Sequence, residues 1–279
     1  MTLQRNLYGG EYAASMKRPI QALVLSGCLA VIAGCSAIEK TDSFTLTADL
    51  PPNFAYVAKV RYKPAVGETC TVPAKENKAD VFNREWRTEY QPNSQIKLYQ
   101  TVNGCLLALS SIRVDINATY GKDRGDVGGD FGAILVGQQP DERYRGTFNA
   151  SGESEFFGEC QWWFRTVGKL RRIVKLLDCR NTDAQGVPFG PKPLVTLSLK
   201  ELAGKTVRLK IKLAEEEEPA WGDQWVKVQG GWKRCMGKGF EDPRGYCDGD
   251  YTNFSTFRMP DGRNCTIYPG CTENPEVKP

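Results

Sequence analysis

Two arms of sequence decide the fold: Glu155-Phe-Phe-Gly-Glu-Cys160-Gln-Trp-Trp-Phe-Arg165 and Leu170-Arg-Arg-Ile-Val-Lys-Leu-Leu-Asp-Cys179. The short link Thr166-Val-Gly-Lys169 joins them. The two arms predict an antiparallel hairpin in which Cys160 lies almost opposite Cys179. Opposed β-carbons of paired strands lie about 4.5–5.5 Å apart, which is close enough for a disulfide after a small adjustment. The hairpin therefore predicts both a strand pair and a covalent bridge between Cys160 and Cys179.

Strand patterns continue on both sides of this hairpin. Apolar side chains alternate with polar ones from Phe54 to Lys63, and from Cys105 to Tyr120 with an irregularity at Ser110-Ser111. A second hairpin is predicted from Leu194–Lys200 and Thr206–Ala214, turning near Ala203-Gly204. Shorter strands are predicted at Ile96 and Leu98, Phe131–Val136 and Tyr144–Phe148. Because no sustained helical periodicity follows residue 35, we expect residues 53–214 to form an all-β domain, either an antiparallel sandwich or an open barrel.

The tail after this domain has a different composition. Glu215–Glu218 is an acidic run before Pro219, and it marks the predicted boundary of a C-terminal subdomain over residues 219–279. Its last 45 or so residues are rich in turn signals and too short to fill an apolar core, so disulfides would have to stabilise it. We expect a mostly irregular, disulfide-rich segment.

The chain has ten cysteines, and eight of them follow residue 35. An even set in an exported chain predicts a disulfide framework, whose connectivity does not follow from spacing alone. Proximity favours Cys70–Cys105, Cys235–Cys247 and Cys265–Cys271 beside the Cys160–Cys179 pair. There is no Cys-x-x-Cys motif, so neither a thioredoxin-like redox site nor a zinc ribbon is indicated.

The amino-terminal sequence carries an export signal. Lys17 and Arg18 precede an apolar run of about a dozen residues, which suits a signal peptide and is too short to span a membrane. The run ends in Ile32-Ala-Gly-Cys35, which resembles the lipobox of bacterial lipoproteins. That resemblance implies cleavage before Cys35 and attachment of a lipid to its thiol. Leu25-Ser-Gly-Cys28 also fits, but it would leave a hydrophobic stub on the mature protein.

The lipobox fixes the expected boundaries at this end. Residues 1–34 are interpreted as the signal peptide, with Met16 as the true start, and residues 35–52 as a polar tether that ends in Pro51-Pro52. Ser36 follows the lipid-bearing cysteine. In the enterobacterial lipoproteins that this sequence resembles, a residue other than Asp at that position implies release to the outer membrane. The resemblance therefore implies a protein anchored there and facing the periplasm.

Composition excludes several kinds of chemistry. The chain has no histidine, which removes Ser-His-Asp and Cys-His catalysis and most catalytic zinc sites. The net charge of +4 on 279 residues gives no support to nucleic-acid binding. We therefore predict a protein that is not an enzyme and that needs no cofactor or metal.

Two kinds of residue are candidates for partner binding. Alternation places Trp162 and Phe164 on one face of the hairpin and Trp163 on the other, so Trp163 is the best candidate for an exposed tryptophan, where packing in the core is the alternative. Basic strand faces form the second kind, with an ordinary solvated face as the alternative. Their candidate residues are Arg171 in the first hairpin and Arg208, Lys210 and Lys212 in the second.

The tail from Trp225 to Cys271 resembles envelope lipoproteins of pseudomonads, and more loosely the periplasmic lipoproteins that act as immunity proteins against type VI secretion lipase effectors. Its signature residues are Trp225, Trp232, Cys235, Phe240, Cys247, Cys265, Tyr268 and Cys271. The resemblance implies a lipid-anchored, protein-binding function, in which a secreted lipase is a possible target. A module that binds peptidoglycan or another glycan is the alternative.

Overall fold

A computed structural model of the chain describes residues 42–73, 78–81, 86–168, 171–229, 231–235, 257–258, 262, 264–265 and 267–269. All of them belong to one compact unit, Lys40–Pro279. The strands are β1 (Ser43–Asp49), β2 (Phe54–Pro64), β3 (Lys78–Val81), β4 (Asn93–Lys97), β5 (Tyr99–Val102), β6 (Cys105–Thr119), β7 (Val127–Gly137), β8 (Glu153–Val167), β9 (Arg172–Thr182), β10 (Pro188–Gly190), β11 (Leu194–Ser198), β12 (Thr206–Leu213), β13 (Glu218–Pro219), β14 (Trp225–Val228), β15 (Gly231–Arg234), β16 (Phe257–Arg258), β17 (Asn264–Cys265) and β18 (Ile267–Pro269). Three short 3₁₀ turns complete the described elements: η1 (Glu142–Tyr144), η2 (Leu199–Glu201) and η3 (Gly222–Gln224).

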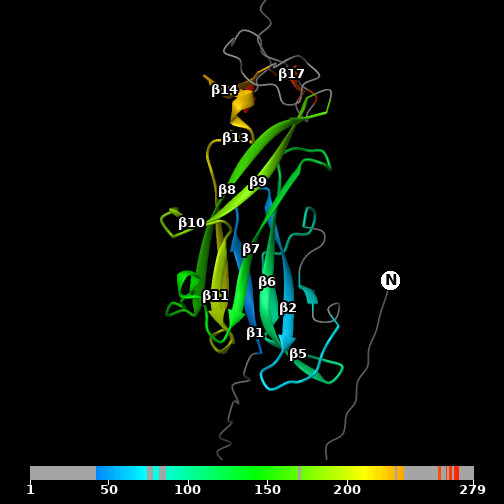
Figure 1. Cartoon of the computed structure of the whole chain (residues 1–279), viewed down its shortest axis with the longest axis vertical. Coiled ribbons are helices and arrows are strands. Elements are labelled where there is room, and N and C mark those ends of the chain that lie inside the picture. The colour runs from blue at the N-terminus through cyan, green and yellow to red at the C-terminus, as the bar shows by residue number, and fades with distance from the viewer. Residues whose placement is uncertain are drawn as a thin grey trace, which may run out of the picture. The chain divides into compact units, whose positions relative to one another are not determined.

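Two sheets enclose the core. Sheet A has the strand order β10-β9-β8-β12-β1-β4, with β13 added to β8, and sheet B has the order β11-β7-β6-β2-β3, with β5 added to β6. Figure 1 shows β11, β7, β6 and β2 side by side, and β8 and β9 as a long hairpin. The expected all-β fold is confirmed. The sheets are mixed rather than purely antiparallel, because β12 pairs in parallel with β8 and β1, and β11 pairs in parallel with β7.

The strand alternation in the sequence becomes the inside and outside of the sandwich. In β2, Tyr56, Val60 and Tyr62 are buried, while Lys59 and Arg61 between them are exposed. Opposite them the register of β6 shifts by one residue, so that Ser110 is a bulge between Arg61 and Tyr62 of the neighbouring strand. The Ser110 hydroxyl donates to the Arg61 carbonyl at 3.1 Å, and the predicted irregularity is thus confirmed.

The β8–β9 hairpin and two disulfides are also confirmed. Cys160 lies directly opposite Cys179, and the two are bonded and fully buried. Cys70 is bonded to Cys105 and so fixes the loop after β2 to the start of β6. Cys235 is disulfide-bonded as well. The predicted pairs Cys235–Cys247 and Cys265–Cys271 include residues outside the described part of the chain.

The two sheets meet where β7 packs against the β8–β9 hairpin. Lys192, just before β11, holds this seam with Nζ at 2.5 Å from Asp130 Oδ2 of β7 and 2.7 Å from Asp178 Oδ1 of β9. The Asp130 carboxylate also accepts the backbone N–H of Cys179 at 2.5 Å. A side chain, rather than a neighbouring strand, therefore satisfies the Cys179 N–H at this edge of β9.

Three sequence-based expectations are wrong. Leu194–Lys200 and Thr206–Ala214 do not form a hairpin, because β11 belongs to sheet B and β12 to sheet A, and the η2 turn connects the two sheets. Tyr144–Phe148 is not a strand; η1 ends at Tyr144, and Arg145 makes one isolated bridge to Thr196. The predicted tether 35–52 includes β1, whose Phe44 and Leu46 are buried in the core.

The C-terminal segment is packed against the β8–β9 hairpin rather than separated from it. β13 pairs with β8 at Trp163 and Phe164. The Trp225 ring meets the Phe164 ring edge to face at 4.8 Å, and the Trp232 ring lies 6.4 Å from it. Phe164 is fully buried, so the tryptophans of the tail complete a small apolar core at this end of the hairpin. The boundary predicted after Glu215–Glu218 does not divide the compact unit.

Candidate functional site

The basic strand face predicted on Arg208, Lys210 and Lys212 lies on the outer face of sheet A, beside acidic residues. Arg208 Nη1 lies 2.8 Å from Asp49 Oδ1, and its Nε binds Glu153. Lys210 Nζ lies 2.7 Å from Glu155 Oε1, and Lys212 faces Glu159 across the β12–β8 pairing. The neighbouring strands thus balance the cations of β12, and the surface has little net positive charge.

Arg171 does not lie on an exposed basic face. It sits in the turn before β9 with φ = 47°, and only 3% of its surface is accessible. The strand alternation that predicted its exposure does not extend into this turn. The prediction that Arg171 contacts a partner from an exposed strand face is therefore wrong.

Trp163 is the predicted residue around which an exposed apolar surface is found. It is half-buried on the outer face of β8 and pairs across the hairpin with Leu176, which is 41% exposed. The next outward pair is Arg165 and Val174. The Arg165 guanidinium lies 5.4 Å from the ring centre of Trp221, which is 49% exposed. We call these five residues the hairpin patch.

Most of the hairpin patch was missed in the sequence. The predicted register of the hairpin could have identified Leu176 and Val174, because they lie opposite Trp163 and Arg165, two outward residues of β8. Trp221 joins the patch only because β13 leads the chain back along β8. Tryptophan and arginine are enriched among the residues that dominate binding energy at protein interfaces.

A hollow opens beside Trp86. It encloses about 280 Å³ and is lined by residues from the start of β2, the 86–87 turn and the loop after β6, namely Asn53, Phe54, Ala55, Trp86, Arg87, Thr119, Gly121, Lys122 and Asp123. The Arg87 guanidinium lies 5.4 Å from the Trp86 ring centre. An aromatic ring among polar side chains is a suitable surface for a sugar.

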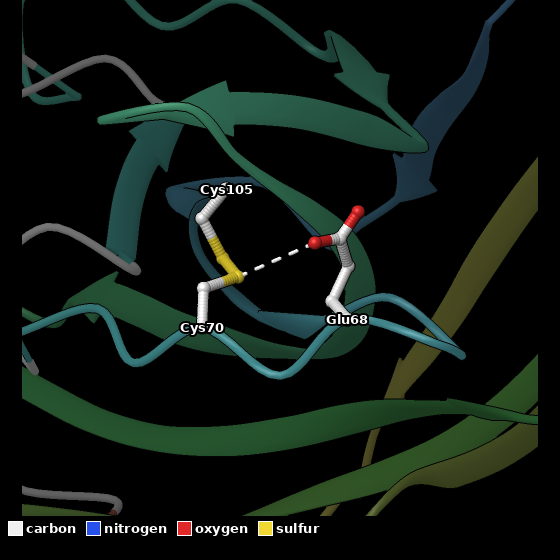
Figure 2. A group of neighbouring side chains, drawn as sticks. All are labelled: Glu68, Cys70 and Cys105. Atoms are coloured by element: carbon white, nitrogen blue, oxygen red, sulfur yellow. Dashed lines mark hydrogen bonds between the residues drawn. A yellow bond between two sulfur atoms is a disulfide. The ribbon is translucent and has the colours of Figure 1, made fainter.

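One group of potential metal ligands was found among the described residues, formed by Glu68, Cys70 and Cys105. Figure 2 shows that both sulfurs are in the disulfide, with Glu68 pointing at the bridge. The 3.5 Å separation of Glu68 Oε2 and Cys70 Sγ is a close approach, because a bridged sulfur has no proton to donate. Metals bind the thiolate, which the disulfide does not offer, so the group fits no metal in this state.

The clear pKa shifts have structural causes. Burial raises the pKa values of Tyr56 and Tyr62, whose hydroxyls donate to backbone carbonyls inside the sandwich. Desolvation would raise the pKa of Asp178, but hydrogen bonds and charge from Lys192 and Arg180 together outweigh it and lower that pKa. At Lys192, hydrogen bonds and charge from Asp130 and Asp178 outweigh desolvation and raise the pKa. These groups stabilise the seam and the core.

No protein-family model, curated protein or solved structure was found to match the chain. Within the described residues, none of the helices has the length and apolar character needed to cross a bilayer. The predicted lipidation site Cys35 lies outside those residues. Its modification stays a prediction from the lipobox.

Proposed function

We propose that this chain is a lipid-anchored protein of the bacterial cell envelope, facing the periplasm, that binds another protein and catalyses no reaction. The observation that carries protein binding is the hairpin patch: two tryptophans, two aliphatic side chains and an arginine gathered on a disulfide-braced hairpin. A rigid aromatic anchor loses little conformational entropy on binding, which favours affinity.

The anchor and the compartment come from the sequence and the disulfides. A charged start, a short apolar run and Ile32–Cys35 support export and lipidation at Cys35, with the outer membrane as the expected site. Bonded cysteines suit the oxidising periplasm. Among possible partners we test first a secreted lipase effector, the class indicated by the resemblance of the tail to immunity lipoproteins.

A competition assay tests this function. Cells that lack the gene are challenged by sibling cells that carry the effector, and the gene is restored as wild type, Trp221→Ala or Val187→Ala. Val187 is a matched control because it is 59% exposed and lies outside the hairpin patch. Truncating a central aromatic residue typically weakens binding by 2 kcal/mol or more, roughly thirtyfold.

We expect wild type and Val187→Ala to restore survival and Trp221→Ala to fail at equal protein abundance. Survival that is the same with and without the gene would contradict the immunity role. Survival that Trp221→Ala restores fully would contradict the assignment of the hairpin patch as the binding surface.

A glycan-binding module is the second candidate, and the hollow beside Trp86 favours it. Purified peptidoglycan sacculi are sedimented with the full-length protein, either wild type or Trp86→Ala. Co-sedimentation that Trp86→Ala abolishes and Trp221→Ala retains would favour glycan binding over the proposed protein partner.

A further inference from the structure

The outer face of sheet B combines a row of cations with a row of apolar side chains. Strand register places Lys63, Ala108 and Tyr99 in one line across the sheet. The next line is Arg61, Ser111 and Leu135, and the third is Lys59, Arg113 and Ala133. Phe131 lies beyond it on β7. The cations thus come mainly from β2, small residues from the middle, and the large apolar side chains from β5 and β7.

The face is hollowed where the small residues Ser111 and Ala133 lie among longer side chains. The hollow encloses about 320 Å³ and is lined by Lys59, Arg61, Arg113, Phe131 and Leu135 together with Ser111 and Ala133. Tyr99 is 40% exposed and Leu135 is 44% exposed, which leaves the apolar row open to solvent. We call this surface the cationic–apolar face.

The charge on this face is not balanced as it is on sheet A. Lys59 and Arg113 share one carboxylate, Asp115, each at 2.5 Å. Arg61 and Lys63 have no ion pair in the described part of the chain. Pairing with β3 adds Lys78 opposite Arg61 and Asp80 opposite Lys59, so by register these lines carry five cations and two carboxylates. The Arg113 guanidinium also lies 3.8 Å from the ring centre of Phe131. A surface that is anionic on the outside and apolar beneath would complement both the cations and the apolar side chains of this face.

The predicted lipid anchor favours a membrane as that surface, because the described chain begins a few residues after Cys35 and close to this face. The Asp42 carbonyl accepts the N–H of Leu98 at 2.6 Å, directly before Tyr99 of the cationic–apolar face. Asp42 comes seven positions after Cys35, and a fully extended chain spans about 3.3–3.6 Å per residue. A lipid on Cys35 would therefore hold Asp42 within about 25 Å of its point of attachment.

We infer that the cationic–apolar face docks on the anionic lipid surface to which the protein is anchored. Lys59, Arg61, Lys63 and Arg113 would meet lipid phosphates, and Tyr99, Phe131 and Leu135 would contact the headgroup–acyl boundary. The hairpin patch, on the other sheet, stays free for a protein. This inference rests on the proposed lipid anchor.

The test measures lysine reactivity in the full-length protein, purified with its anchor and reconstituted in vesicles. One set contains phosphatidylcholine alone, and the other includes one-third phosphatidylglycerol. After treatment with an amine-reactive reagent, mass spectrometry compares Lys59 and Lys63 with Lys212, which is exposed on the outer face of sheet A. We expect phosphatidylglycerol to reduce labelling of Lys59 and Lys63 roughly fivefold and to leave Lys212 unchanged.

Arg61→Glu should restore labelling of Lys59 and Lys63 on anionic vesicles, whereas Lys212→Glu should not. Equal labelling on both vesicles would overturn the inference, as would protection by an acidic peptide but not by vesicles. The intact mass of the same sample reports lipidation separately. A lipidated protein without protection contradicts only the docking; an unlipidated protein that is still protected contradicts only the anchor.

Discussion

Gly128 in β7 marks the closest approach of sheet B to the β8–β9 hairpin, and replacing it by alanine should destabilise the fold. A β-carbon at this position would lie 2.4 Å from Trp162 Cζ3 and 3.2 Å from Leu177 Cβ. Carbon atoms in contact are normally about 3.5–4.0 Å apart. Trp162 is buried and packs edge to face against Tyr120 at 5.5 Å, so its ring has no free space to move into.

Overpacking of this kind costs about 1–3 kcal/mol. Gly137 in the same strand is the matched control, since nothing lies within 4 Å of its β-carbon position, and alanine there should gain about 0.5–1 kcal/mol. The two effects differ by about 1.5–4 kcal/mol, and 1 kcal/mol shifts the melting temperature of a domain of this size by about 2–4 °C, so we expect the Gly128→Ala variant to melt about 3–16 °C below Gly137→Ala in circular dichroism. Equal melting temperatures would refute the packing of β7 on Trp162.

Three further changes probe the disulfide, the seam and the tail. Replacing Cys160 and Cys179 together by alanine should cost about 3 kcal/mol, because the bridge closes a separation of 19 residues; an unchanged urea midpoint would be inconsistent with that bridge. Lys192→Met should cost about 2 kcal/mol near neutral pH. Because contacts lower the pKa of Asp178 from 3.8 and raise that of Lys192 from 10.5, this cost should be full between about pH 4 and 10 and shrink on either side; urea midpoints that differ equally at all pH values would argue against the ion pair. Phe164→Ala should cost about 3–5 kcal/mol and expose the chain after residue 214 to protease; a digestion pattern like that of wild type would show that the tail does not depend on this ring.

The local pattern of apolar and polar residues was sufficient to predict many strands of the sandwich. Alternation located β2 and β6, and Ser110-Ser111 marked the bulge because two polar residues interrupt the apolar series. The Cys160–Cys179 bridge was predictable since a short turn fixes the register of its hairpin. Phe44 and Leu46 also carry the alternation of β1, but the surrounding Ser, Thr and Asp residues are equally typical of a polar tether.

Pairing between distant strands was not predictable in the same way. A period of two identifies a strand without identifying its neighbour. Proximity in sequence therefore favours pairing β11 with β12, although each runs parallel to a strand far away in sequence. The net charge of each strand face was unpredictable for the same reason, because it depends on which strands are neighbours. Arg208 gave a basic pattern that carboxylates on β8 balance, while the cations of β2 gained Arg113 only through strand pairing.

The mass of the amino-terminal peptide, taken from protein purified from its native host, tests the central claim most directly. The account predicts that this peptide begins at Cys35 and carries a diacylglyceryl group on the thiol and an acyl group on the amine. An amino terminus upstream of Cys35 with an unmodified thiol would contradict the lipid anchor, and with it the envelope location proposed for this chain.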